Sequence, residues 1–158
     1  MPQTFDGGCA CGAVRLRMLS APMFVHCCHC RDCQRQTGSA FVINALIEAD
    51  RVDVEGDTEG VVVPTDSGMP HTIHRCPACR IALWSEYSGR AAIRFMRVGT
   101  LDDPTALTPD VHIYARTKLP WVRLAEDARV FDAYYDSKQE WPAASLERRD
   151  AVFGKAPE

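Results

Sequence analysis

Short runs of alternating apolar and polar residues recur along the chain, and turn residues separate them. Residues 14–18 and 51–55 alternate regularly, which is typical of strands with one buried face. Residues 41–47 form a more continuously apolar run, as expected for a more buried strand. Further strands are predicted at residues 23–27, 60–64, 71–75, 81–85, 92–98, 111–114 and 130–134. The pattern therefore predicts a mainly β fold of rolled or sandwiched antiparallel sheets.

Helix signals are few. Residues 31–36 suit one or two helical turns that end at Gly38. Residues 143–149 suit a short C-terminal helix, with fraying or disorder toward residues 154–158 as the alternative. We therefore expect one main domain over residues 1–135 and a C-terminal extension over residues 136–158, either a short helix or partly disordered.

Composition narrows the class of protein. The chain has 158 residues, of which 46% are hydrophobic and 25% charged, as expected for one soluble domain with a core. A net charge of −3 does not suggest a nucleic-acid partner. No apolar run approaches the length of a membrane span, and residues 1–6 lack the apolar segment of a signal peptide. We therefore expect a cytoplasmic protein with no membrane partner. A homo-oligomer stays open, because Trp84, Trp121 and Trp141 suit either a core or a subunit contact.

Seven of the eight cysteines fall into three tight clusters. These residues are Cys9, Cys11, Cys28, Cys30, Cys33, Cys76 and Cys79. In a reducing compartment, clustered thiols are more often metal ligands than disulfides. Four thiolates close a structural zinc site, whereas three leave one coordination position open, as in catalytic sites. Seven thiolates divide into four and three, so we predict two Zn²⁺ per chain, one structural and one catalytic.

The spacing within each cluster suits a shared ion. Residues i and i+2 of a strand face the same way, so Cys9 and Cys11 can bind one metal, as can Cys28 and Cys30. A Cys-x-x-Cys spacing returns the second sulfur to the same ion through a tight turn. The pairing that we predict joins two segments distant in sequence through a four-cysteine zinc site, which would hold the sheet together. Its ligands are Cys9, Cys11, Cys76 and Cys79. This pairing leaves a local open site of Cys28, Cys30 and Cys33.

The fourth position of the open site has several candidate ligands. Water or an incoming thiol would keep it reactive, and a zinc-bound thiol loses its proton to become a nucleophile. A histidine nitrogen would instead close it, and the candidates are His26, His29, His71 and His74. Cys27 points to the opposite face from Cys28 and is interpreted as a small buried apolar residue.

The ordered motifs resemble a known family. Gly7-Gly8-Cys9-x-Cys11-Gly12, Cys28-His29-Cys30-x-x-Cys33 and Cys76-Pro77-x-Cys79 are similar to motifs of the glutathione-dependent formaldehyde-activating enzymes and their centromere protein V relatives. Later landmarks such as His112-Ile113 and Trp121 fit as well. The resemblance implies a small zinc-binding all-β domain with the same ligand pairing. It also implies addition of the glutathione thiol to formaldehyde, a carbon–sulfur lyase activity. Arg80 departs from the pattern, because the family usually has glycine there.

Three hypotheses follow. The first is a zinc-dependent carbon–sulfur lyase acting on a thiol adduct of a small aldehyde, with Cys28, Cys30 and Cys33 as the catalytic zinc ligands. Arg31 and Arg35 would attract the carboxylates of glutathione.

Other polar residues near the motifs have two interpretations in this hypothesis. Thr37 and Ser39 either donate hydrogen bonds near the metal or shape the turn at Gly38. Asp102 and Asp103 either form an acid–base pair or belong to a turn before Pro104.

The second hypothesis is a non-catalytic zinc-stabilised binding module, and the third is a thiol redox protein.

Overall fold

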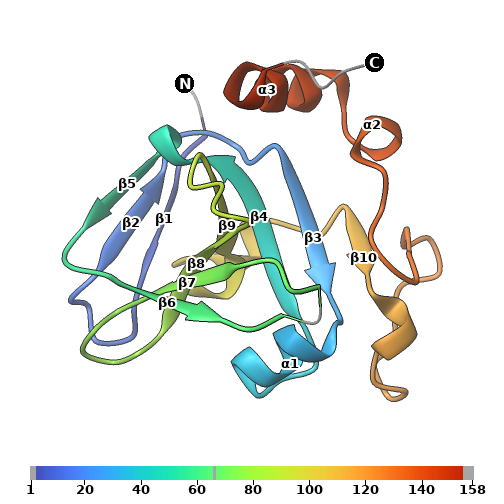
Figure 1. The fold of residues 1–158 in the computed structure, drawn as a ribbon, viewed down its shortest axis with the longest axis horizontal. Helices are drawn as coiled ribbons and strands as arrows, with labels where there is room; N and C mark the ends of the chain where they lie inside the picture. The colour runs from blue at the N-terminus through green and yellow to red at the C-terminus, as the bar shows by residue number, and fades with distance from the viewer. Residues whose placement is uncertain (1–2, 66, 155–158) are drawn as a thin grey trace. The chain divides into compact units, whose positions relative to one another are not determined.

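The computed structural model describes residues 3–65 and 67–154, and short strands dominate it (Figure 1). The strands are β1 (Phe5–Gly8), β2 (Arg15–Met18), β3 (Phe24–Cys28), β4 (Val42–Glu48), β5 (Val52–Glu55), β6 (Glu59–Val63), β7 (His71–Arg75), β8 (Ala82–Tyr87), β9 (Ile93–Arg97) and β10 (Val111–Ile113). The α-helices are α1 (Arg31–Thr37), α2 (Ser137–Glu140) and α3 (Ala143–Phe153), and 3₁₀ turns cover Ala49–Arg51, Val98–Thr100, Pro104–Ala106 and Ala115–Thr117. The chain divides into two compact units, Met1–Pro22 with Ala45–Leu107 and Met23–Asn44 with Thr108–Glu158.

Antiparallel pairing builds the first unit. Strands β1, β2 and β5 form a sheet in that order, and β9, β8, β7 and β6 are hydrogen-bonded neighbours in that order. Leu16 and Met18 alternate with exposed or half-buried arginines on β2, so one face of this strand lines the core. Gly56 ends β5 with a φ of +95°, and a Cβ there would lie 2.1 Å from the Ala13 carbonyl oxygen. Only glycine fits this close approach.

In the second unit, β3 and β10 pair in parallel. The register sets His112 opposite Cys27 and Ile113 opposite Cys28. The Asp110 carboxylate accepts a hydrogen bond from the Val25 amide at 2.8 Å, which helps to fix the start of the ladder. All five residues of β3 are buried, so this strand runs through the core of the unit. This pair is parallel, whereas the predicted fold class named antiparallel sheets.

Most of the predicted elements are present among the described residues. The mainly β class with few short helices is confirmed. The helix predicted at residues 31–36 is α1, and Gly38 ends it in a left-handed conformation. Residues 130–134 form no strand, since only Val130 makes an isolated bridge with His112. Strand β1 was not predicted, because two of its four residues are glycines.

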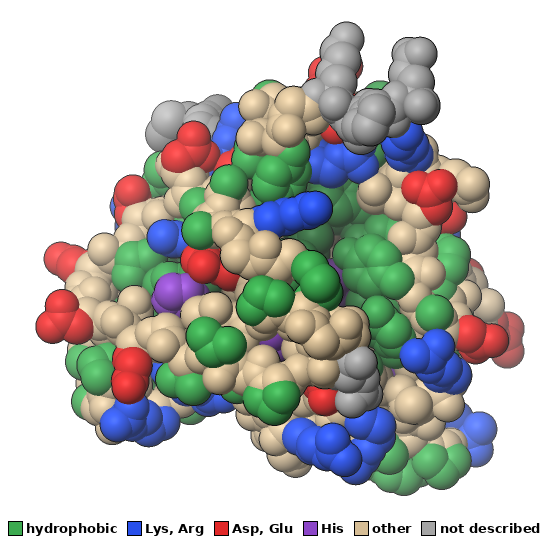
Figure 2. Space-filling model, viewed as in Figure 1, with side chains coloured by type: hydrophobic (Ala, Val, Ile, Leu, Met, Phe, Trp, Pro, Cys, Tyr) green, Lys and Arg blue, Asp and Glu red, His purple; other side chains and the backbone are tan. Residues whose placement is uncertain are grey.

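The C-terminal segment is helical and packs within the second unit. Ser145 of α3 donates a hydrogen bond to the Met23 carbonyl at 2.6 Å. Residues 155–158 of the predicted extension lie outside the described residues, and the predicted boundary at residue 135 stays a prediction. No helix in the described part of the chain is long and apolar enough to span a membrane. On the face shown in Figure 2, acidic and basic side chains are interspersed.

Trp141 is expected to be the main anchor of the C-terminal segment. Its ring stacks on Phe24 with centroids 5.5 Å apart, and its Nε1 donates to the Tyr135 hydroxyl at 3.0 Å. Trp141→Ala should lower the free energy of unfolding by about 3 kcal/mol, because it leaves a large cavity. Trp121→Ala is the matched control, since Trp121 is 68% exposed, and should change stability by less than about 0.5 kcal/mol. Denaturant unfolding followed by circular dichroism measures both, and equal losses would contradict the anchoring role.

Candidate metal centres

Four cysteines converge in the first unit. The Sγ atoms of Cys9, Cys11, Cys76 and Cys79 all lie within 4.8 Å of one another. The Cys9–Cys11 and Cys11–Cys76 sulfurs are 3.5 and 3.7 Å apart. Tetrahedral zinc with Zn–S bonds of about 2.3 Å separates its sulfurs by about 3.8 Å. All four are free thiols, so the set fits a zinc ion without a disulfide having to break.

Turns, and not strands, position the first pair of sulfurs. Cys9 to Gly12 form a turn directly after β1, in which the Gly12 amide donates to the Cys9 carbonyl at 3.3 Å. Gly12 has a φ of +79°, a backbone conformation that favours glycine. The Val14 amide donates to the Cys9 sulfur at 3.2 Å. The prediction that Cys9 and Cys11 share a strand face is therefore wrong, although their sulfurs do meet.

The second pair lies in a knuckle between β7 and β8. The Arg80 amide donates to the Cys76 carbonyl at 2.9 Å, and the Cys76 amide donates to the Ile81 carbonyl at 3.0 Å. Backbone hydrogen bonds from Ile81 and Cys11 lower the pKa of Cys79 to about 6. Arg80 follows the knuckle with a φ of +66°, so it adopts the left-handed conformation that glycine would favour.

Three cysteines converge in the second unit. Cys28 is the last residue of β3, Cys30 is the N-cap of α1, and Cys33 lies in the first turn of that helix. Their sulfurs lie within 4.8 Å of one another, and the Cys30 sulfur accepts the Cys33 amide proton at 3.3 Å. A strand end, the extended residue Cys30 and a helix start therefore bring the three together. Cys28 and Cys30 lie on the same side of this extended segment, as predicted, although Cys30 itself lies beyond the strand.

Charge is shared unequally within this cluster. The thiols of Cys28 and Cys33 donate hydrogen bonds to the Cys30 sulfur, which holds the pKa of Cys30 well below its ordinary value. The same contacts and burial raise the pKa of Cys28. The cluster thus stabilises one negative charge by itself. A cation would stabilise three, and an all-sulfur donor set suits zinc.

The histidines suggested as a fourth ligand do not join this cluster among residues 3–65 and 67–154. His29 points to the opposite face of the chain, where it groups with Cys27 and His112. Burial raises the pKa of Cys27 to about 12, and burial together with His112 lowers the pKa of His29 to about 4. The opposite orientation of Cys27 from Cys28 agrees with the prediction, whereas its pairing with two histidines was not foreseen.

Several other candidate residues have structural roles. Asp102 forms an ion pair with Arg15, and Asp103 caps a 3₁₀ turn by accepting the Thr105 amide proton at 3.0 Å. The turn interpretation of the two aspartates therefore holds. Thr37 donates to the Cys33 carbonyl at 3.0 Å and accepts from the Ser39 amide, as expected for residues shaping the helix end at Gly38.

Sequence reasoning missed Tyr114. This residue has a φ of +55°, an unusual conformation for an aromatic residue, and it directly follows β10. Burial raises the pKa of its hydroxyl, and the electrostatic influence of the Cys28 and Cys30 sulfurs raises it further. Tyr114 therefore stays protonated near the three-cysteine cluster. A left-handed tyrosine has no signal in the sequence, because local propensity favours other residues there.

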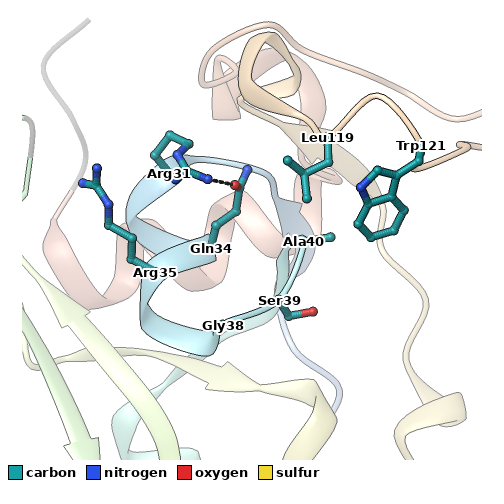
Figure 3. Close-up of a pocket in the computed structure, with 8 residues that line it drawn as sticks. All are labelled: Arg31, Gln34, Arg35, Gly38, Ser39, Ala40, Leu119 and Trp121. Carbon is teal, nitrogen blue, oxygen red and sulfur yellow. Dashed lines mark hydrogen bonds between the residues drawn. The ribbon is translucent and has the colours of Figure 1, made fainter.

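A cavity of about 430 Å³ adjoins helix α1 (Figure 3). Its lining residues are Arg31, Gln34, Arg35, Gly38, Ser39, Ala40, Leu119 and Trp121. Arg31 donates a hydrogen bond to the Gln34 side-chain oxygen. In Figure 3 the guanidinium of Arg35 extends away from Trp121. The two arginines predicted to recognise carboxylates thus border a cavity on the helix that also carries Cys33.

The model of the family described as "Glutathione-dependent formaldehyde-activating enzyme" matches residues 4–117. The chain belongs to this family. A Halomonas elongata protein, provisionally named a glutathione-dependent formaldehyde-activating enzyme, is 30% identical over 147 residues, covering 87% of this chain and 94% of that protein. The match to a crystal structure of a Rhodobacter sphaeroides protein covers 80% of this chain and 98% of that chain, with 17% identity and a TM-score of 0.45.

The conformation of Arg80 predicts the effect of two substitutions in this family member. Arg80→Gly should leave zinc content unchanged and should be more stable than Arg80→Val by about 1–2 kcal/mol, because a β-branched residue is strained at a φ of +66°. Arg80 also forms an exposed ion pair with Glu59, and its loss in both variants cancels in the comparison. Thermal and denaturant unfolding of the zinc-loaded variants measures the difference. Equal stability of the two would contradict the importance of the left-handed backbone.

Proposed function

We propose that this chain is a zinc-dependent carbon–sulfur lyase that forms or cleaves the adduct of a thiol, such as glutathione, with formaldehyde or a related small aldehyde. The observation that carries the proposal is the cluster of Cys28, Cys30 and Cys33, which holds three sulfurs and no fourth side-chain ligand among the described residues. Family membership supports the substrate class. We also propose two Zn²⁺ per chain for these functions, with Cys9, Cys11, Cys76 and Cys79 as structural ligands, in a cytoplasmic protein.

The reaction itself is simple. The thiol sulfur bonds to the carbonyl carbon, the carbonyl π electrons move to oxygen, the oxygen takes up a proton, and the thiol loses one. A zinc ion held by the three cysteines would supply an open coordination position and lower the pKa of a bound thiol. The protein must then bind the thiol substrate, orient it and stabilise the developing charge on oxygen.

Arg31 and Arg35 are the proposed binding residues for glutathione. Glutathione carries two carboxylates, and guanidinium groups recognise carboxylates through paired N–H donors. Arg31 is already oriented by Gln34, whose amide nitrogen donates to the His29 carbonyl at 2.8 Å. This chain of contacts links the arginine to the backbone beside Cys28 and Cys30. Substrate binding and the metal cluster are therefore supported by the same short segment.

Tyr114 is the proposed hydrogen-bond donor to the aldehyde oxygen. Its raised pKa keeps the hydroxyl protonated at neutral pH, which a donor requires. Its ring lies under the Arg116 guanidinium, 5.5 Å from the ring centroid, and this contact helps to hold the side chain. A strained backbone at such a residue is typical of functional sites.

The two cysteine clusters should respond differently to the same chemical change. Cys30→Ser is expected to lose one zinc and the activity while the fold persists, because the three-cysteine cluster is local. Cys79→Ser should unfold or aggregate the chain, because structural zinc contributes on the order of 10 kcal/mol to folding. Elemental analysis, circular dichroism and the rate of formaldehyde-dependent thiol loss above the uncatalysed rate measure the three effects.

The same experiment separates the alternatives. Zinc loss from Cys30→Ser without any catalytic rate in the parent protein would indicate a zinc-stabilised binding module. Low zinc content with a disulfide would indicate a thiol redox protein, although all eight cysteines are free thiols in the structure. If both serine variants behave alike, the division into structural and catalytic sites is wrong.

Tyr114→Phe should lower the catalytic rate by about 100-fold while zinc content stays unchanged, because only the hydroxyl donor is removed. Tyr134→Phe is the matched control, since Tyr134 is 47% exposed and lies in the same unit, and it should retain the parent rate. The measurement is the rate of adduct formation at saturating thiol. An unchanged rate in Tyr114→Phe would exclude the hydroxyl from the reaction.

A further inference from the structure

A second set of metal-binding side chains lies on the other face of the Cys27–Cys30 segment. The Cys27 sulfur, the His29 Nε2 and the His112 Nδ1 all lie within 4.8 Å of one another. The Cys27 sulfur is 3.6 Å from His29 Nε2, and His29 Nε2 is 3.0 Å from His112 Nδ1. Nothing in the proposed reaction uses these three residues.

The β3–β10 ladder explains why they meet. His112 is the register partner of Cys27, and paired residues of adjacent strands share a face of the sheet. His29 lies two residues beyond Cys27, so the alternation of an extended chain returns its side chain to that face. The His29 amide donates to the Ile113 carbonyl at 3.0 Å, which extends the pairing to His29. The alternation therefore separates this set from Cys28 and Cys30.

Two of the three side chains are almost fully buried. Cys27 and His29 are 1% and 0% exposed, whereas His112 is half-buried and borders the solvent. The His29 carbonyl accepts hydrogen bonds from the Gln34 side-chain amide at 2.8 Å and the Thr117 hydroxyl at 3.0 Å. The backbone beneath the ligand atoms is thus fixed before any ion arrives, with an approach past His112.

Hydrogen bonds cannot satisfy all three of the Cys27, His29 and His112 side-chain atoms at once. A single imidazole nitrogen either donates one proton or accepts through one lone pair, yet His29 Nε2 faces both the Cys27 sulfur and His112 Nδ1. At most one of these neighbours obtains a full hydrogen bond. A cation between the three atoms would engage all of their lone pairs at once. The nearby Lys118 ammonium is held by the Leu119 and Val122 carbonyls.

We propose that Cys27, His29 and His112 form a third metal site, one sulfur and two nitrogens, for a divalent cation of the zinc class. Zn–S bonds of about 2.3 Å and Zn–N bonds of about 2.0–2.1 Å place sulfur and nitrogen about 3.6 Å apart and the two nitrogens about 3.3 Å apart. The Cys27–His29 distance already matches, and the imidazoles need to separate by about 0.3 Å. Binding releases the Cys27 proton to solvent, and water approaching past His112 completes the coordination.

Metal stoichiometry tests the proposal. The full chain is saturated with Zn²⁺, passed through a desalting column and analysed for zinc per chain. Cys27→Ala and His112→Gln should each hold one equivalent fewer than the parent protein. Val25→Ala is the matched control, because it truncates another buried side chain of β3 without removing a ligand atom, and it should keep the parent stoichiometry.

Cobalt substitution identifies the ligands. Titration of the parent protein with Co²⁺ should show one equivalent whose sulfur-to-cobalt absorption is weaker than that of the others, since it has a single thiolate, and Cys27→Ala should lack it. Equal zinc content in the parent protein, Cys27→Ala and His112→Gln would overturn the proposal and leave a hydrogen-bonded triad. His112→Gln carries the test if Cys27→Ala fails to fold, because His112 is only half-buried. The difference between variants does not depend on the role of the three-cysteine cluster.

Discussion

The constraint on which this molecule depends is the close convergence of sulfur atoms. Four thiols within 4.8 Å of one another make poor hydrogen bonds when protonated and repel one another when ionised. A cation removes both problems, because thiolates bound to zinc are both charged and satisfied. Structural zinc contributes on the order of 10 kcal/mol, which is comparable to the whole net stability of a typical domain, about 5–15 kcal/mol. With the proposed zinc ion bound, the turns that present Cys9 and Cys76 would belong to a folding unit in which the metal acts as part of the core.

The cluster of Cys28, Cys30 and Cys33 is built from one short segment of the chain. Its three sulfurs come from a strand end and the first turn of a short helix, within six residues of sequence. The proposed metal at this cluster is not needed for the β3–β10 ladder, since that ladder relies on backbone hydrogen bonds and on buried residues such as Val111. The same alternation of β3 places sulfur and imidazole donors on its other face. Residues 27–30 thus contribute to two separate sets of potential metal ligands, and no residue belongs to both sets.

Much of this could be predicted from the sequence, and the failures have identifiable causes. Alternation located most strands, and Gly38 correctly marked the end of α1. The grouping of cysteines by spacing also agrees with the sulfur positions. The assumed route was wrong, however: Cys9 and Cys11 meet through a turn that Gly12 makes possible. Cys-x-Cys spacing is compatible with a strand face and with a turn, and the spacing alone does not distinguish them.

Long-range register and backbone strain account for the remaining errors. The parallel pairing of β10 with β3 joins segments more than 80 residues apart, and no local pattern encodes it. For this reason the meeting of His112 with Cys27 and His29 was not foreseen. Residues 130–134 have a strand-like composition, but only Val130 makes a bridge. Tyr114 adopts its left-handed conformation against its own propensity, so tertiary contacts must impose it.

Arg80 adopts a left-handed backbone conformation directly after Cys79. A glycine at this position would adopt a φ of +66° without strain, whereas arginine bears a cost of about 1–2 kcal/mol. That cost is small beside the free energy of closing a four-thiolate zinc site. The knuckle between β7 and β8 can therefore impose the left-handed conformation on whatever residue follows Cys79. The sulfur atoms of Cys76 and Cys79 lie within 4.8 Å of those of Cys9 and Cys11 with arginine at this position, so the left-handed arginine is compatible with the four-thiol cluster.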